Sequence, residues 1–311
     1  MRRLHTVLTA ALLTVGLVAL TAACSPSGES ADNKAAGSSD GKPTVVASTS
    51  MWAAVARQIA GDHADVTAVI DNPQQDPHDY EASAQDKLTF SKATVTIVNG
   101  GGYDDWAVSL AAKGTTVVNA VEVSGLPGAG KDGFNEHVWY SPAAAKQVAT
   151  RVSEALAKAD AQHSSDYQAN LVTFTTTVDE LATRAQQIGA KNKAGQAGVD
   201  IVSTEPVAVH LFEAAGLTDA TPHEFVEQSE SDAGPSVAAV NETVKLIGSG
   251  RVRALAVNPQ TSDPVADKLI AAAKQASVPT FEVYEVLPDA TMSWTDFLGA
   301  TLDSLEKALN Q

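Results

Sequence analysis

The sequence predicts an α/β protein built from two lobes that are joined by one long helix. Three observations lead to this class. Short β-branched segments alternate with segments whose apolar residues recur at helical spacing, this alternation occurs twice, and an unusually long helical segment separates the two runs. Such alternation is typical of parallel sheets with helices on their faces. With 311 residues, 44% of them hydrophobic, the chain is large enough for two globular cores.

The first run begins with TVVASTS, a β-branched segment expected to form a buried strand. MWAAVARQIAG follows with apolar residues at helical spacing and ends at Gly61, a common helix stop. A second short helix is expected at 83–93. The strands of this run are expected at 44–50, 65–70, 94–100 and 114–121. Ligands of such sheets bind at the carboxyl ends of the strands, so the segments that follow strands are of most interest.

Two helical segments lie between the runs. Ser141 is a good N-cap and Pro142 suits the first helical position, so a helix is expected from Pro142 to a break near Asp160. The next segment, 164–190, would extend roughly 40 Å at the helical rise per residue. A helix of this length is better suited to bridging two lobes than to packing within one.

The second run repeats the pattern of the first. Strands are expected at 198–204, 252–258 and 278–286. Helices are expected at 207–216, 236–250, 263–277 and 293–309. The last of these is amphipathic and closes the chain.

The N-terminus indicates export. Arg2 and Arg3 precede an apolar run, Val7–Leu20, which is too short to be trusted as a membrane-spanning helix and is typical of a secretory signal. The run ends in TAAC, which resembles the lipobox of bacterial lipoproteins, although Thr21 stands where leucine or valine is more usual. This resemblance implies cleavage before Cys24 and a diacylglycerol on its thiol; the alternative is an ordinary signal peptide. Cys24 is the only cysteine, which excludes a disulfide framework.

The predicted organisation has five parts. Residues 24–43 are rich in Ser, Gly, Asp and Ala, which is typical of a flexible tether. The parts are a lipoprotein signal peptide at 1–23, the tether from lipidated Cys24 at 24–43, the first lobe at 44–141, the linking helices at 142–190 and the second lobe at 191–311. We therefore expect an exported protein that is lipid-anchored to the outer face of the cytoplasmic membrane.

The charge balance restricts the classes of binding partner that we expect. The 37 acidic and 21 basic residues give a formal charge of −16, which argues against nucleic acid because nucleic-acid binding needs a basic surface. A net negative charge raises the local concentration of cations, but it does not by itself show that a cation binds.

Three polar residues follow strand-like segments in comparable positions. His78 lies in DPHDYE after the second strand, His137 lies in NEHVWYSP after the fourth, and Glu205 follows the strand at 198–204. Two imidazoles and one carboxylate suit a divalent transition metal. The two histidines are too far apart for a local motif, so only the fold could bring them together. On the pattern alone, solvated loop residues remain the alternative.

Several motifs occur together in one order along residues 44–311. They are DPHDYE (76–81), VNGGGYDDW (98–106), HVWYSP (137–142), STEPVAVHLFEAAGL (203–217), VNPQTSDPVADKL (257–269) and LPDATMSWTDFL (287–298). This series resembles the metal-binding lipoproteins, or solute-binding proteins, of zinc and manganese ABC importers. The resemblance implies two α/β lobes joined by a long rigid helix, with the metal site in the cleft between the lobes. It also implies Zn²⁺ or Mn²⁺ as the transported ligand and His78, His137 and Glu205 as metal ligands.

The resemblance leaves the fourth ligand open. Manganese-type members carry an aspartate after the last strand, near the position of Leu287 in this sequence. Glu285 would share the face of Leu287 if the strand continues, and it is the preferred ligand over Asp289 or water. Glu205 stands where many zinc-specific members have histidine, and oxygen is the harder donor, so manganese becomes a serious contender. His210 lies where the family often has tyrosine. Its side chain either supports the metal ligands without contacting the ion or, as the simpler expectation, lies on the exposed surface of the helix.

The function implied is capture of a metal ion outside the membrane and its delivery to an ABC permease with its ATPase. Such a protein is not an enzyme, and we expect a monomer. A metal-dependent hydrolase is an alternative, but it would need an open coordination position and a general base, and no HExxH-like motif is present. A surface adhesin is a further alternative, because such lipoproteins sometimes carry that name.

Overall fold

The structure is a computed structural model that describes residues 41–75, 77, 80–193, 200–229, 233–261 and 263–311. The predicted signal peptide, Cys24 and His78 lie outside the described residues. The chain from Asp40 to Gln311 forms one compact unit.

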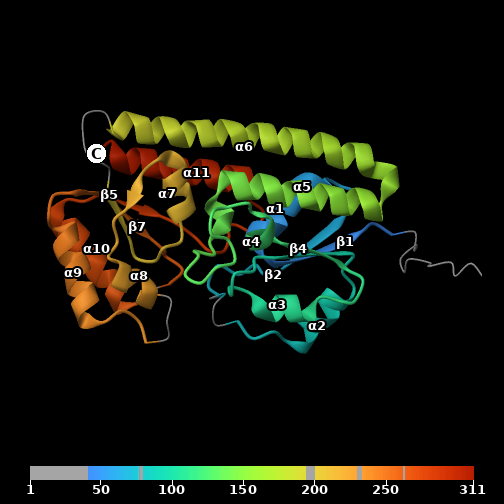
Figure 1. The fold of residues 1–311 in the computed structure, drawn as a ribbon, viewed down its shortest axis with the longest axis horizontal. Coiled ribbons are helices and arrows are strands. Elements are labelled where there is room, and N and C mark those ends of the chain that lie inside the picture. Colours follow the sequence, from blue (N-terminus) through green and yellow to red (C-terminus); the bar gives the residue numbers. More distant parts are fainter. Residues whose placement is uncertain (1–40, 76, 78–79, 194–199, 230–232, 262) are drawn as a thin grey trace, which may run out of the picture. The chain divides into compact units, whose positions relative to one another are not determined.

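The first lobe is a parallel sheet with helices around it (Figure 1). Its strands are β1 (Thr44–Thr49), β2 (Asp65–Ile70), β3 (Val95–Val98) and β4 (Thr116–Asn119), in the order β2-β1-β3-β4. Its helices are α1 (Ser50–Ala60), α2 (Ala84–Ser91), α3 (Asp105–Leu110) and α4 (Ala120–Val123). The strand predicted at 114–121 gives way to α4 at Ala120, where the Asn119 side chain accepts from the Glu122 N–H and caps the helix. Helix α3 was not predicted.

The linking helices agree with the sequence pattern. After a short 3₁₀ helix, η1 (Val138–Tyr140), helix α5 spans Pro142–Ala159, and Ser141 caps it by accepting from the Ala144 N–H. A second 3₁₀ turn, η2 (Ala161–His163), leads into α6 (Ser164–Lys193), which has 30 residues. Helix α6 contacts α1 and α5 of the first lobe, and α7 and α11 of the second (Figure 1). It therefore joins the two lobes as predicted.

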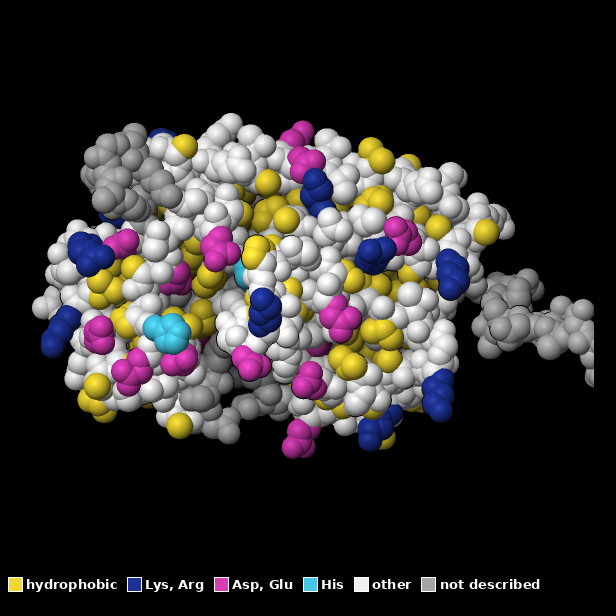
Figure 2. Space-filling model, viewed as in Figure 1, with side chains coloured by type: hydrophobic (Ala, Val, Ile, Leu, Met, Phe, Trp, Pro, Cys, Tyr) yellow, Lys and Arg dark blue, Asp and Glu magenta, His cyan; other side chains and the backbone are white. Residues whose placement is uncertain are grey.

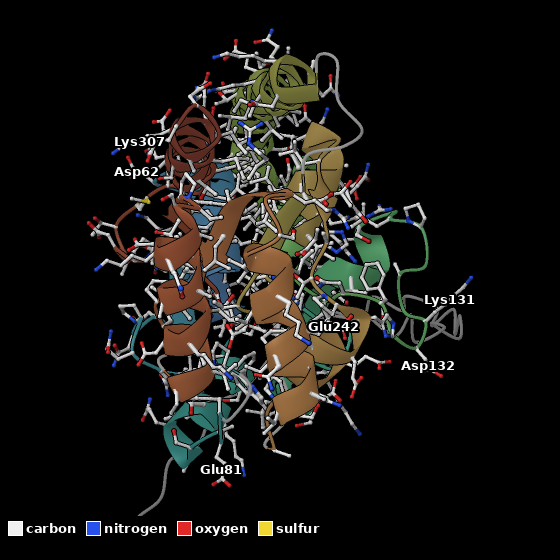
Figure 3. The ribbon with its side chains drawn as sticks, turned by 90° about the vertical axis from the view of Figure 1, so that its left-hand side faces the viewer. Asp62, Glu81, Lys131, Asp132, Glu242 and Lys307 are labelled. Atoms are coloured by element: carbon white, nitrogen blue, oxygen red, sulfur yellow. The ribbon has the colours of Figure 1, made fainter. Side chains whose placement is uncertain are left out.

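The second lobe repeats the architecture. Its strands are β5 (Asp200–Ser203), β6 (Thr218–Asp219), β7 (Val252–Val257) and β8 (Thr280–Glu282), in the order β6-β5-β7-β8, again all parallel. Its helices are α7 (Val209–Ala215), α8 (His223–Ser229), α9 (Val237–Ile247), α10 (Pro264–Ala276) and α11 (Trp294–Leu309). Helices α9 and α10 stand side by side in the foreground of Figure 3.

Three details of the second lobe differ from the sequence-based expectation. Strand β6, which has only two residues, and helix α8 were not predicted. The strand expected at 278–286 was predicted too long: β8 ends at Glu282, so Glu285 lies in the connection that follows the strand.

The two sheets share one strand order. In each, the first strand along the chain lies between the second and the third, so the connections diverge to either side of it. Open parallel sheets bind ligands outside the carboxyl ends of the strands at such a switch point. The predicted class, two α/β lobes joined by a long helix, is confirmed. The residue boundaries given for the five parts stay a prediction.

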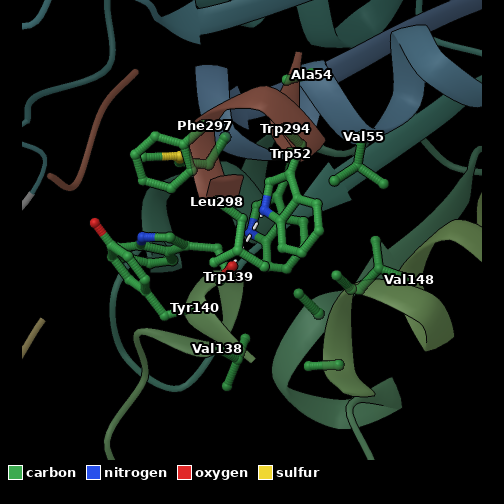
Figure 4. Packing of buried hydrophobic residues seen from close by; sticks show 14 of the residues in the cluster. Trp52, Ala54, Val55, Val138, Trp139, Tyr140, Val148, Trp294, Phe297 and Leu298 are labelled. Carbon is green, nitrogen blue, oxygen red and sulfur yellow. Dashed lines mark hydrogen bonds between the residues drawn. The ribbon is translucent and has the colours of Figure 1, made fainter. Parts of the chain in front are cut away.

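A continuous apolar core runs through both lobes and the long helix. Figure 4 shows aromatic side chains of both halves packed together in it. Trp294 of α11 donates from Nε1 to the backbone carbonyl of Trp139 at 3.1 Å, and the Tyr284 N–H donates to the Tyr140 hydroxyl at 2.8 Å. These contacts fix the segment that follows β8 against the segment that carries His137. The lobes are thus joined by buried packing in addition to α6.

On the face drawn in Figure 2, acidic and basic side chains of the described residues are interspersed rather than gathered into a basic stripe. No helix among the described residues is long and apolar enough to cross a membrane.

Candidate metal centre

Polar side chains from both lobes converge where the strands end. Asn99 directly follows β3, Asn258 directly follows β7, and Glu205 comes two residues after β5. His137 and Glu285 lie in the connections after β4 and β8. The carboxyl ends of parallel strands share one edge of a sheet, which is why residues distant in sequence meet there.

His137 is fully buried, immediately before η1. Its ring packs edgewise against two aromatic rings, with centroid distances of 6.0 Å to Tyr103 and 5.0 Å to Trp139. The imidazole is therefore held in one orientation by its surroundings, as a metal ligand needs to be.

The glycine-rich turn after β3 aims Tyr103 at Glu285. Buried Asp104 accepts from the Asn99 N–H at 2.6 Å and from the Gly100 N–H at 2.7 Å, which closes the turn. Burial raises the pKa of the Asp104 carboxyl above its ordinary value. Gly100 has φ +77°, and a Cβ there would lie 2.2 Å from the Asn119 amide oxygen, so glycine is required. The Tyr103 hydroxyl then donates to Glu285 Oε2 at 3.0 Å.

Asn258 connects the two glutamates. Its Nδ2 donates to Glu205 Oε2 at 2.6 Å and to Glu285 Oε1 at 3.0 Å. Its backbone N–H donates to the Thr204 hydroxyl at 3.1 Å, which ties the end of β7 to the end of β5. One amide group therefore brings two carboxylates together and partly offsets their mutual repulsion.

Gln260 determines where Glu285 points. Its Oε1 accepts from the backbone N–H groups of Glu285 and Val286 at 2.8 and 3.1 Å, and its Nε2 donates to the Val286 carbonyl at 2.9 Å. These three bonds replace the strand ladder that the sequence pattern predicted at this place. Glu285 is therefore directed inward and is only 4% exposed, even though the strand has already ended.

The structure thus brings three of the four predicted ligands together. His137, Glu205 and Glu285 form one network through Tyr103 and Asn258. In the described part of the chain, which does not include His78, no three His, Cys, Asp or Glu side chains stand in direct metal-binding proximity. The fourth predicted ligand, His78, is among the residues that are not described.

The alternative fourth ligand points elsewhere. Asp289 is exposed, and its Oδ1 accepts from the Thr291 N–H at 2.8 Å and from the Thr291 hydroxyl at 2.7 Å. These bonds lower the pKa of the Asp289 carboxyl and commit it to a local turn. Of the two candidates, only Glu285 joins the network.

Sequence reasoning missed the polar residues that connect the predicted ligands. Tyr103 and Asn258 both occur in motifs that carried the family resemblance, but their roles depend on distant partners. His210, for which a helix-surface position was the simpler expectation, is buried at 8% exposure and bonds through Nε2 to the Asn135 carbonyl at 2.8 Å. A polar residue directly after a buried strand was the one available signal, and it applies to Asn258.

Comparisons with known proteins agree with this architecture. The family described as zinc-uptake complex component A periplasmic, ZnuA, matches residues 45–308. A manganese-binding lipoprotein, MntA, of Halalkalibacterium halodurans is 30% identical over 141 residues, which is 44% of this chain and 46% of that protein. The chain thus spans about half the length of that relative. The manganese ABC transporter substrate-binding lipoprotein PsaA of Streptococcus anginosus is 25% identical over 280 residues, 85% of this chain and 84% of that protein.

Two solved structures show the same fold. The periplasmic zinc-binding protein TroA from Treponema pallidum has a TM-score of 0.73 at 18% identity, covering 86% of this chain and 99% of that one. The laminin-binding protein Lmb of Streptococcus agalactiae, described as having adhesin and metal-transporting activity, has a TM-score of 0.72 at 19% identity with the same coverages. The family match extends over nearly the whole described unit. This chain therefore belongs to the ZnuA family of zinc-uptake complex components.

Proposed function

We propose that this protein is an extracytoplasmic solute-binding lipoprotein that captures Zn²⁺ or Mn²⁺ and delivers it to an ABC permease with its ATPase. The observation that carries the proposal is the convergence of His137, Glu205 and Glu285 from both lobes at the carboxyl ends of the two sheets. Capture and release require no covalent chemistry, and the relatives of the family are named as transporter components.

The proposed ligands are His137, Glu205 and Glu285, with His78 as the fourth. Neutral imidazoles and ionised carboxylates are the forms that bind a cation, so affinity is expected to fall as the solution becomes acidic. Tyr103 and Asn258 would stay as hydrogen-bond donors to the glutamates. They would orient the carboxylates while the remaining lone pairs face the ion.

The donor set bears on the choice of metal. Two imidazoles with two carboxylates form a harder set than three imidazoles, which favours Mn²⁺ relative to a typical zinc site. The two curated relatives named above are described as manganese proteins. Zn²⁺ nevertheless has the higher intrinsic affinity for such donors, so competition between the two ions is the decisive comparison.

The proposed location follows from Cys24. A diacylglycerol on its thiol would hold the compact unit near the outer face of the cytoplasmic membrane through the tether at 24–43. The relatives named as lipoproteins of ABC importers support this location. A monomer suffices, because the proposed ligands all come from one chain.

Thermal unfolding of the mature protein with each ion tests the proposal. A ligand that binds only the folded state at a hundredfold excess over Kd stabilises it by about 2.7 kcal/mol. We expect such a shift with Mn²⁺ or Zn²⁺, and we expect His137→Ala and Glu205→Ala to abolish it. His223→Ala is the matched control, since His223 is exposed on α8 and pairs with Glu227 on the same helix. A wild-type protein that shows no shift with either ion would refute the proposal.

A further inference from the structure

One side-chain amide, that of Asn135, connects His137 to the second lobe. Its Nδ2 donates to the carbonyl of Pro206, the residue after Glu205, at 2.8 Å. Its Oδ1 lies 3.0 Å from the backbone nitrogen of His137 and 3.1 Å from Nδ1 of the His137 ring. Asn135 therefore contacts the neighbours of two proposed ligands, one in each lobe.

These partners determine which terminal atom of the Asn135 side chain is the oxygen and which is the nitrogen. A backbone carbonyl only accepts, so the atom that faces Pro206 must be the amide NH₂. A backbone N–H only donates, so the atom that faces His137 must be the amide oxygen. Both partners require the same orientation of the Asn135 amide, and the flipped orientation would break both hydrogen bonds.

The orientation of the amide in turn determines the tautomer of His137. The Asn135 oxygen can only accept, so Nδ1 of His137 must carry the proton that lies between them. In a neutral imidazole the other nitrogen, Nε2, then carries the lone pair. A metal binds through that lone pair, and histidine ligands are commonly oriented by a bond from their other ring nitrogen.

His210 fixes the backbone of the same residue. Its Nε2 lies 2.8 Å from the Asn135 carbonyl oxygen, which requires a proton on that nitrogen. The ring also packs on Phe134 with a centroid distance of 5.5 Å and is 8% exposed. The loop before Asn135 is glycine-rich, with its tip at Lys131 and Asp132 directed away from the body of the protein in Figure 3. The end of this loop is therefore anchored on the second lobe.

We propose that Asn135 is a positioning residue that prepares His137 for metal before the ion arrives. Its oxygen selects the tautomer with a lone pair on Nε2, and its NH₂ group holds the His137 segment beside Glu205 through Pro206. His210 supports both roles by fixing the Asn135 backbone. The functional part of this inference rests on the proposed metal capture, whereas the tautomer is a property of the metal-free protein.

Two substitutions separate the acceptor role from the donor role. Asn135→Ala removes both contacts, whereas Asn135→Asp keeps an oxygen for His137 and loses the donor to Pro206. Asn170→Ala is the matched control, because Asn170 also joins two elements by an amide-to-carbonyl bond, from α6 to Ile59 at 3.0 Å, remote from the site. All variants are made in the mature full-length chain.

The first measurement is long-range ¹H–¹⁵N NMR of the histidine rings in the chelator-treated protein. We expect the Nδ1–H tautomer at His137 in the wild type, in Asn135→Asp and in Asn170→Ala. In Asn135→Ala we expect the His137 ring to populate a mixture of the two tautomers. A wild-type His137 with its proton on Nε2, or an unchanged tautomer in Asn135→Ala, would overturn the inference.

The second measurement is the affinity for Mn²⁺ and Zn²⁺ by calorimetry. Loss of a residue that orients a ligand typically weakens metal binding about 10- to 100-fold, and we expect this for Asn135→Ala. We expect Asn135→Asp to retain more affinity than Asn135→Ala, and Asn170→Ala to bind as the wild type does. Equal affinities for Asn135→Ala and Asn170→Ala would overturn the positioning role. Should the wild type bind neither ion while its tautomer is as expected, the proposed function fails and the geometry of His137 stands.

Discussion

Replacing Asn258 by alanine should destabilise the metal-free protein far more than the loss of an ordinary amide. The side chain is 1% exposed, and its Nδ2 donates to Glu205 at 2.6 Å and to Glu285 at 3.0 Å. Hydrogen bonds to charged groups contribute about 1.5–3 kcal/mol each, and an unsatisfied buried carboxylate costs more. Without the amide, each carboxylate would lose this donor, while Tyr103 would still donate to Glu285.

The expected magnitude follows from these two bonds. Taking the lower end for each, the unfolding free energy should fall by about 3 kcal/mol. For chains of this size each kcal/mol corresponds to about 2–4 °C in Tm, so we expect a loss of about 6–12 °C. Asn258 is also proposed to orient the two carboxylates, so its loss should weaken metal binding, and the same excess of metal should stabilise the variant less than the wild type.

The assay is thermal unfolding followed by circular dichroism, first with chelator and then with excess Mn²⁺. Asn192→Ala is the control, since Asn192 donates to the Ile188 carbonyl one turn earlier in α6. A double-mutant cycle with Glu285→Gln isolates the term between the amide and the buried carboxylate. A Tm loss in Asn258→Ala no larger than that of Asn192→Ala, or a coupling energy of zero, would refute the reasoning.

Two further predictions concern the fold. Gly189→Ala in α6 should destabilise by about 1–3 kcal/mol or more, because the added Cβ would lie 1.7 Å from the Ala215 carbonyl oxygen. Gly299→Ala in α11, where the nearest side-chain atom is 3.8 Å away, should be neutral or stabilise by about 0.5–1 kcal/mol; urea unfolding compares the two, and equal effects would contradict the packing of α6 on α7. The hydrogen bond from His163 holds the pKa of the Asp160 carboxyl below its ordinary value, so its stabilising effect is present above the unfolded-state pKa, about 4, and is lost as pH falls through the folded-state pKa. Asp160→Asn should therefore lose less unfolding free energy than the wild type between pH 7 and pH 3. The exposed-loop variant Asp132→Asn is the control. If Asp160→Asn loses as much unfolding free energy as the wild type or as this control, the stabilising role of the Asp160 carboxylate is contradicted.

Local sequence patterns predicted most of the fold. β1 is buried at five of its six residues, so its β-branched run was a clear signal. The caps of α5 and α10 use side chains next to a proline at the first helical position, so their starts could be recognised from sequence. The failures occurred at β6, which has only two residues, at helices α3 and α8, and at α4, which was predicted as the end of a strand. The strand β8 was predicted too long, because side-chain bonds from Gln260 replace the strand ladder after Glu282.

The candidate site, like the fold, could be predicted from the sequence only in part. His137 and Glu205 were predicted as ligands because they follow predicted strands, and Glu285 was predicted on a strand that in the structure has already ended. Their roles as ligands stay a prediction. Asn135, Tyr103 and His210 could not be assigned their roles, since each bonds to a residue more than 70 positions away along the chain. Such contacts leave no periodicity in the sequence.

The sequence alone determined the two-lobed α/β class and the long connecting helix, and it predicted an export signal and the residue types able to hold a divalent cation. Each of these depends on local chemistry: propensity, apolar spacing, capping and donor type. The tertiary structure decided the rest, because it brought the carboxyl ends of two sheets together. Only there do Asn258 and Tyr103 meet the carboxylates, and only there does the Pro206 carbonyl orient the amide of Asn135 and hence the ring of His137. Hydrogen-bond direction depends on the partner across space, and sequence order does not specify that partner.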